Sequence, residues 1–293
     1  MVSKTGFSLI AAAAIAATLG SVPLAAHANS IGISFGTNNV AANDQLGSTQ
    51  SAGVVAQKNW NNENYTTNNA GGTQNYGLPP SPNNLGSTSP IVDSSGASTS
   101  VTGTVLTSDA YDITAVVGGG ANSSNGNQLM MNGAIFVKTS PGPVIVSLSN
   151  IPYTLYDVYV YTLVIHSGDT VETAIGTATG NPLGFTPGAA PGDVVYETSP
   201  NPVGSGYIDG TTNPFTFTQA TSTSSASPTP LGDYAEFTNI TGSSFAVAAY
   251  DSTNVPAINA IQIVQVVPEP ATLGLMAVLG TGILVLGKRW KKA

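Results

Sequence analysis

Short apolar stretches alternate with polar residues along most of this chain. The alternation is clearest at 156–161 and 258–264, and a period of two is typical of strands with one buried face. Between the two chain ends, no window of a dozen residues shows a 3.6-residue period. The pattern therefore predicts a body made of strands, with almost no helix.

Clusters of Gly, Pro and Asn separate the expected strands. These strands lie at 31–36, 101–106, 110–117, 129–138, 144–151, 156–166, 171–179, 193–197, 214–218, 234–240, 244–250 and 258–266. The Asn/Gly/Ser-rich stretch 61–100 is interpreted as a long loop with little regular structure, and 220–230 as a second exposed loop. Many short, punctuated strands predict an all-β fold, an antiparallel β-sandwich that is jelly-roll-like.

Two stretches echo each other. Residues 146–152 and 234–242 each contain an Asn-Ile pair near their end and lead into a further strand, so each predicts a strand, an Asn-Ile turn and a second strand, that is, a β-hairpin. Through their strand rhythm, these stretches and the closing strand resemble the carbohydrate-binding-type and galactose-binding-like sandwiches of surface proteins. That resemblance implies no particular ligand residue.

The N-terminus carries an export pattern. Lys4 precedes the apolar stretch 7–19, and small residues at Ala26 and Ala28 predict cleavage before Asn29. Residues 1–28 are therefore expected to be a signal peptide, and 29–266 the exported β-sandwich.

The C-terminus carries an anchor pattern. Residues 271–287 contain no charge, and a basic tail follows, formed by Lys288, Arg289, Lys291 and Lys292. As a helix this run would span about 25 Å, enough for a thin bilayer. Because cations on one flank favour the cytoplasmic side, residues 267–293 are expected to hold a single transmembrane helix.

Just before that run stand Val267, Pro268, Glu269 and Pro270. This motif, the apolar span and the basic tail together resemble the PEP-CTERM sorting signal of Gram-negative bacteria. The resemblance implies recognition by exosortase, a membrane protease-transpeptidase, and passage to the cell surface or extracellular matrix. The alternative is a plain membrane anchor that follows an accidental Pro-Glu-Pro.

Composition narrows the function classes. The chain has no cysteine, so it has neither disulfides nor a thiolate site. Between residues 29 and 267 two cations stand against fourteen acids, a formal net charge of −12. Nucleic-acid binding is argued against, because it needs cationic contacts to phosphate. A surface of Asn, Thr, Ser and Gly suits a hydrated extracellular matrix.

Little catalytic chemistry emerges. His166 is the only histidine beyond the signal peptide, and no Gly-x-Ser-x-Gly motif supports a triad around it. Carboxylate pairs for glycan hydrolysis could come from Asp109/Asp112, Asp169/Glu172 or Asp193/Glu197. Such pairs near strand ends are more often solvated than catalytic, so we expect no enzyme and no cofactor.

No metal site is assigned. Zinc lacks its His and Cys ligands, and calcium suits an acidic sandwich better but has no loop motif here. Trp60, in an Asn-rich stretch, is the candidate sugar contact; the tyrosines Tyr156, Tyr159 and Tyr161 also invite a sugar-stacking role, but Tyr159 and Tyr161 are better interpreted as packing residues.

The expected function is thus that of an exported, non-enzymatic surface or matrix protein, sorted by exosortase and associated with exopolysaccharide or biofilm. The alternatives are a carbohydrate-binding module that holds polysaccharide at the envelope, or a glycan-processing enzyme on the same fold.

Overall fold

The computed structural model describes most of the body of the chain. The described residues are 28–37, 45–65, 74–78, 90–112, 125–137, 142–162, 169–180, 183–198, 217–230, 232–251 and 255–267. Residues Asn29–Val266 form one compact unit. Within the described ranges no helix is long and apolar enough to cross a bilayer. Both apolar terminal segments, 7–19 and 271–287, lie outside these ranges.

Six strands form a first sheet, sheet 1, in the order β12-β14-β8-β17-β1-β2. Their bounds are β1 (Ser30–Thr37), β2 (Asn61–Tyr65), β8 (Leu155–Tyr161), β12 (Gln219–Ala220), β14 (Tyr234–Thr241) and β17 (Ala260–Gln265). The first and last strands are antiparallel neighbours, with Ser30 opposite Val264. The first and last strands of the body thus lie next to each other in the interior of sheet 1.

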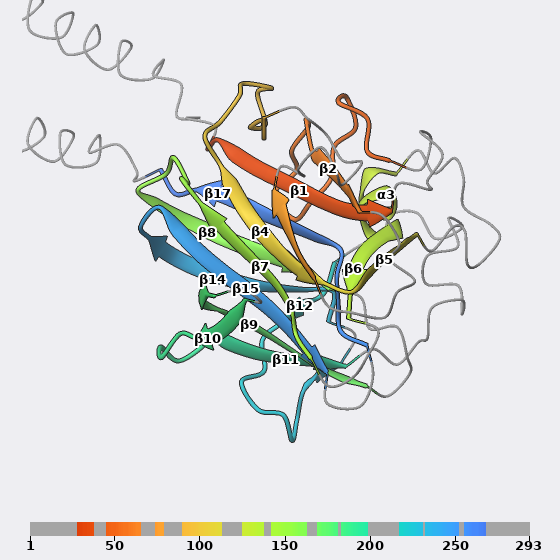
Figure 1. The fold of residues 1–293 in the computed structure, drawn as a ribbon, viewed down its shortest axis with the longest axis vertical. Helices are drawn as coiled ribbons and strands as arrows, with labels where there is room; N and C mark the ends of the chain where they lie inside the picture. Colours follow the sequence, from red (N-terminus) through yellow and green to blue (C-terminus); the bar gives the residue numbers. More distant parts are fainter. Residues whose placement is uncertain are drawn as a thin grey trace, which may run out of the picture. The chain divides into compact units, whose positions relative to one another are not determined.

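A second sheet, sheet 2, has the order β13-β11-β9-β15-β7-β4-β3, and β10 pairs with β9 beside it. Its strands are β3 (Gln74–Leu78), β4 (Thr102–Thr107), β7 (Val144–Ser149), β9 (Thr170–Thr179), β10 (Gly184–Pro187), β11 (Val194–Thr198), β13 (Thr229–Pro230) and β15 (Ser244–Asp251). A small third sheet joins β5 (Asp109–Asp112), β6 (Gly133–Phe136) and β16 (Ala257–Ile258). Figure 1 shows these strands as neighbouring layers.

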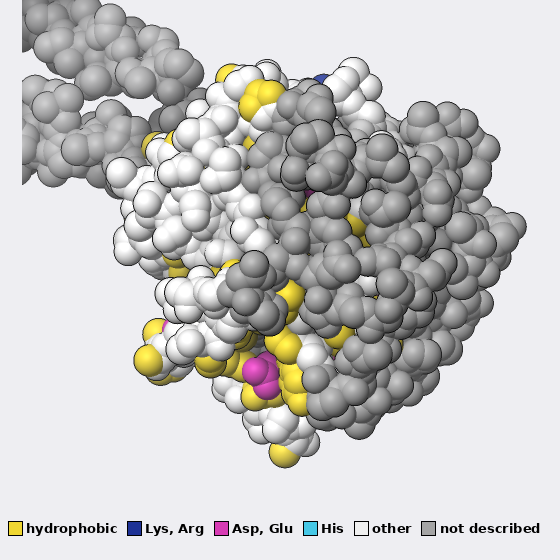
Figure 2. Space-filling view, in the orientation of Figure 1, with side chains coloured by type: hydrophobic (Ala, Val, Ile, Leu, Met, Phe, Trp, Pro, Cys, Tyr) yellow, Lys and Arg dark blue, Asp and Glu magenta, His cyan; other side chains and the backbone are white. Residues whose placement is uncertain are grey.

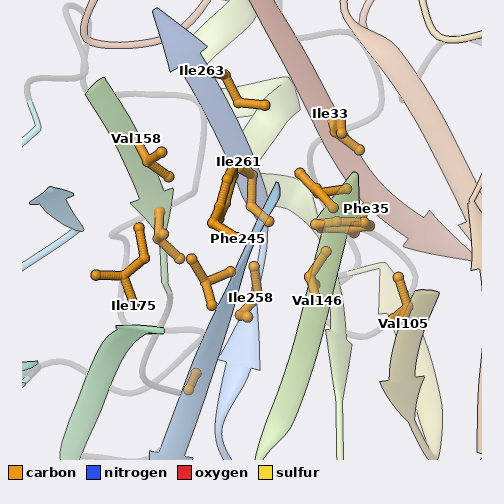
Figure 3. Packing of buried hydrophobic residues seen from close by; sticks show 14 of the residues in the cluster. Ile33, Phe35, Val105, Val146, Val158, Ile175, Phe245, Ile258, Ile261 and Ile263 are labelled. Atoms are coloured by element: carbon orange, nitrogen blue, oxygen red, sulfur yellow. The ribbon is translucent and has the colours of Figure 1, made fainter. Parts of the chain in front are cut away.

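One hydrophobic core lies between sheets 1 and 2. Alternate residues of each strand point into it, because successive side chains of a strand face opposite sides. Ile33, Ile261 and Val158 come from sheet 1, whereas Val146 and Phe245 come from sheet 2. Figure 3 shows these side chains meeting between the strands. The prediction of an all-β, sandwich-like body is confirmed.

The two Asn-Ile stretches are not hairpins. β7 belongs to sheet 2 and β8 to sheet 1, and likewise β14 belongs to sheet 1 and β15 to sheet 2. Each connection is therefore an arch that carries the chain from one sheet to the other. The arches lie side by side, since the Ile151 amide donates to the Ser243 carbonyl at 3.0 Å. The local sequence predicts a strand–turn–strand pattern, but it does not show which sheet each strand joins.

The strand expected at 129–138 is also partly wrong. Residues Gly126–Asn132 form α3, the one helix of the described ranges, and β6 starts only at Gly133. The Asn125 side chain caps this helix by accepting from the Asn127 amide at 3.0 Å. Seven residues are too few for a 3.6-residue period to show in a window of a dozen.

The stretch interpreted as a long loop contains two strands. β2 runs parallel to β1, and β3 pairs with β4, each at one edge of its sheet. β2 is polar because its side chains form hydrogen bonds to backbone groups. Asn61 Nδ2 donates to the carbonyls of Gly32 at 2.8 Å and Val92 at 2.9 Å. Such a strand leaves no apolar alternation in the sequence.

Candidate functional site

The predicted sorting and cleavage residues lie almost entirely outside the described ranges. Ala26, Pro268, Glu269, Pro270 and the basic tail are not described, and neither is His166. Ala28 and Asn29 directly precede β1, and Val267, 38% exposed, is the last described residue. The signal cleavage site, the sorting motif and the basic tail therefore remain predictions.

Trp60 is buried, with 5% of its surface exposed. Its Nε1 donates to the Gln57 carbonyl at 3.2 Å, and its ring meets Tyr161 edge-on with centroids 6.3 Å apart. The indole also lies directly over Gly32, where an added Cβ would stand 2.6 Å from the ring. An indole enclosed in this way presents no open face to a sugar, so the structure argues against Trp60 as a stacking platform.

The structure separates the Asp193/Glu197 pair and places members of the other two pairs. Asp193 caps a turn by accepting from the Ala190 amide at 2.7 Å, whereas Glu197 is buried four residues further along β11. Four residues of extended chain span about 13 Å, beyond the usual separation of a catalytic pair. Asp169 is buried ahead of β9 while Glu172 is partly exposed. Asp109 is buried, and the Asp112 side chain is not described.

Glu197 faces the sandwich interior. It stands opposite Val171, a member of the hydrophobic core, and the Thr162 hydroxyl donates to its Oε1 atom. Its Oε2 atom is buried without a hydrogen-bond partner. Burial raises the pKa of Glu197 to about 8, against the hydrogen bond from Thr162 and with a contribution from the charge of Asp233. This carboxyl joins the two sheets and is closed to ligands.

Glu63 on β2 is a second buried carboxyl, and burial raises its pKa to about 7. No group of three or more His, Cys, Asp or Glu side chains within the described ranges is placed to hold a metal ion.

The tyrosines of β8 divide between the two faces of sheet 1. Tyr156 points into the core against Phe245, with ring centroids 5.9 Å apart. Tyr159 and Tyr161 point outward and pack with Tyr234 at 6.1 and 6.0 Å. All three outward rings are less than a tenth exposed. This cluster agrees with the packing role expected for these residues.

The outer face of sheet 2 carries a different arrangement. On neighbouring strands, Tyr250 of β15 stands opposite Glu172 of β9, and Glu172 stands opposite Tyr196 of β11. Residues directly opposite one another project to the same side of a sheet. All three side chains are partly exposed. We call this set, Tyr250, Glu172 and Tyr196, the tyrosine–glutamate row.

Tyr196 and Glu172 interact electrostatically on one side of the row. The pKa of Tyr196 is raised by burial and by the charge of the neighbouring Glu172 carboxylate. Since strands lie about 4.8 Å apart, the Cβ atoms of Tyr250 and Tyr196 stand about 10 Å apart with the carboxylate midway. The row therefore offers two aromatic rings and one acceptor group along a line.

Small and apolar residues lie on one side of the row. Ala174 and Ala248 occupy the next register position, where they are buried, and a hydrophobic cluster joins Ala248 to Leu183 and Phe185. In the part of the view that Figure 1 labels β9 and β11, Figure 2 shows an acidic side chain bordered by hydrophobic ones. Two partly exposed aromatic side chains on either side of a carboxylate suit a ligand with both C–H and polar faces.

Sequence reasoning singled out Glu172, but only as half of a carboxylate pair with Asp169. It missed Tyr196 and Tyr250, which stand 24 and 78 residues further along the chain. Each closes a short apolar stretch, and only the register of β11, β9 and β15 brings them beside Glu172.

The comparison of this chain with protein-family models, curated proteins and solved structures finds no match to any of them.

Proposed function

We propose that this protein is an exported, non-enzymatic carbohydrate-binding protein of the cell surface or extracellular matrix, and that sheet 2 holds the glycan. The tyrosine–glutamate row is the observation that carries this proposal. Aromatic rings pack on the C–H faces of pyranose rings, and a carboxylate between them accepts hydrogen bonds from hydroxyl groups.

A non-enzymatic role is supported by the same face. Glu172 has two tyrosines as its cross-strand neighbours, with no second carboxylate opposite it. Hydrolysis of a glycosidic bond needs a pair of carboxylates on either side of that bond. The row has the groups for holding a glycan but only one of the two groups for cleaving it.

The proposed export and membrane anchoring rest on the sequence. A signal peptide at 1–28, the motif Val267 to Pro270, a single transmembrane helix and the basic tail would export the chain and hold it in the membrane for exosortase. Exopolysaccharide assembled at the same surface is the natural candidate for the bound glycan. The outcome would be retention of matrix or biofilm polysaccharide at the envelope.

We also propose a jelly-roll-like topology for the sandwich. Its support is the alternation of consecutive long strands between sheets, in which β7 passes to β8, β8 to β9, and β14 to β15 across the core. The first and last strands of the body are also neighbours in sheet 1.

A glycan array probed with the exported protein in detergent tests the function. Binding to defined glycans that is lost in a Tyr196→Ala/Tyr250→Ala double variant is expected, with unchanged far-UV circular dichroism. Release of shorter sugars from a bound polysaccharide would favour the enzyme alternative. Wild-type binding that persists in the folded double variant would remove sheet 2 as the site.

A further inference from the structure

We propose that the tyrosine–glutamate row selects a cationic glycan, an amino-sugar polymer whose amines are free, over neutral and acidic chains. This rests on the proposed function and names the ligand class for the same site. The inference comes from the charge of the row and from what surrounds it.

The first step is the neighbourhood of the carboxylate. Glu172 is flanked on both sides by tyrosines, Tyr250 on β15 and Tyr196 on β11. A phenol hydroxyl donates a hydrogen bond but supplies no positive charge. A carboxylate between two aromatic rings is an arrangement that recognises ammonium groups, because the ring faces and the carboxylate attract the same cation.

The second step is that no described residue of this face carries a positive charge that could compete for Glu172. Lys58 is the only Lys, Arg or His among the residues that the structure describes. Lys58 stands between Gln57 and Trp60, whose side chains pack against Gly32 of sheet 1. It thus belongs to the segment over the other sheet, and no described cation of sheet 2 neutralises Glu172.

The third step is the field of the whole body. Two cations against fourteen acids between residues 29 and 267 give it a formal net charge of −12. Such a field attracts polycations and repels chains that carry carboxylates, sulfates or phosphates. An acidic polysaccharide would bring like charge to Glu172, whereas a glucosamine-type chain would bring its counter-charge.

The fourth step is the shape of the ligand. The row is about 10 Å long, and its three side chains are partly exposed. A pyranose with an equatorial amine can lay its C–H face on a tyrosine ring while its ammonium reaches the adjacent carboxylate. A short run of such sugars would engage both rings and Glu172 together.

Two oligosaccharides that differ only in N-acetylation test the proposal. The probes are the glucosamine hexamer and its fully N-acetylated counterpart, titrated into the full exported chain in detergent at pH 6, where the free amines are charged. We expect the glucosamine hexamer to bind at least tenfold more tightly. In Glu172→Gln this preference should fall to about twofold, while Tyr250→Ala should weaken binding of both hexamers.

Matched controls separate local recognition from net charge. Glu236 lies on sheet 1, where it accepts from Tyr159 at 3.0 Å and from Gln219 at 2.9 Å. Glu236→Gln removes the same charge from the other sheet and should keep the tenfold preference. Hexalysine, a polycation without sugar rings, should bind at least tenfold more weakly than the glucosamine hexamer.

Each contrary result has its own meaning. Equal affinity for the two hexamers, equal loss of preference in Glu172→Gln and Glu236→Gln, or hexalysine binding as tight as the sugar would overturn the amino-sugar assignment and leave the proposed glycan binding standing. Failure of the protein to bind any glycan on the array would overturn both.

Discussion

Glu197 is the residue whose ionisation conflicts most with its surroundings. It is fully buried, and burial raises the pKa of its carboxyl to about 8 from an ordinary value of 4.5. Between these two values the folded protein keeps the proton that the unfolded chain releases. Stability is therefore fully present below about pH 4.5 and falls as the pH rises towards about 8.

We predict that Glu197→Gln flattens this dependence, because the amide keeps the shape of the neutral acid and does not titrate. Wild type should lose stability relative to the variant between pH 5 and pH 8, by at most about 1.4 kcal/mol per pH unit. Urea unfolding of the Asn29–Val266 body at several pH values measures this. Parallel curves for the two proteins would contradict the placement of Glu197 in the interior.

Gly32 provides a second test at this scale. An added Cβ there would stand 2.5 Å from Gln57 Nε2 and 2.6 Å from the Trp60 ring. Gly32→Ala should therefore displace the indole and cost about 1–3 kcal/mol in unfolding free energy. Trp60 is the only tryptophan of the body, since the other is Trp290, so its fluorescence emission should shift to the red.

Gly47→Ala is the control for that substitution. Its Cβ would meet only the flexible end of Gln50, at 3.4 Å, so stability and emission should match wild type. An unshifted spectrum in Gly32→Ala would mean that Trp60 does not lie over β1.

At the scale of elements, the arches between the sheets depend on backbone conformations that ordinary residues avoid. Asn150 directly follows β7 and has a φ of 60°, in the left-handed region. Its Nδ2 atom also donates to Thr102 Oγ1 at 3.1 Å. Asn and Gly tolerate this region better than other residues.

We predict that Asn150→Ala lowers the unfolding free energy by about 1–2 kcal/mol, because alanine is strained at this φ. Asn150→Gly should lose much less, since glycine adopts the conformation freely and forgoes only the bond to Thr102. Urea unfolding of both variants gives the comparison. Equal losses would place the cost in the hydrogen bond rather than in the backbone.

Elements with one buried face could be predicted from the sequence, and the others could not. β1, β8, β15 and β17 carry alternating or continuous apolar residues that face the core, and all were expected. β2 could not be predicted from an apolar pattern, because its asparagines form hydrogen bonds to backbone groups. The tyrosine–glutamate row could not be predicted, because the register between distant strands is a tertiary property. Of its members, the sequence singles out only Glu172.

At the scale of the whole molecule, the predicted sorting signal can be tested apart from glycan binding. Two prolines bracket Glu269 and lack the backbone donor that a helix interior needs. They should keep this stretch extended with one carboxylate displayed. An extended peptide with a fixed charge is suited to recognition in a protease cleft.

Glu269→Ala and Pro270→Ala should therefore each leave export intact but block C-terminal processing, so that the chain accumulates with its tail from Lys288 to Lys292. Mass spectrometry of the C-terminus in a host with exosortase checks this. Replacing the tail cations by Gln should act differently, by disturbing orientation in the membrane. Normal processing of both point variants would leave only an ordinary anchor.

The pairing of the first and last strands governs the order in which the body can fold. β17 lies between β1 and β8 in sheet 1, so these two strands share no edge until β17 fills the gap. A chain that emerges N-terminus first presents β1 and β8 long before β17. Contacts between such distant segments form slowly, and unfilled strand edges invite pairing with other chains. Sheet 1 can therefore be completed only after β17, its last strand along the chain, has been made and lies between β1 and β8.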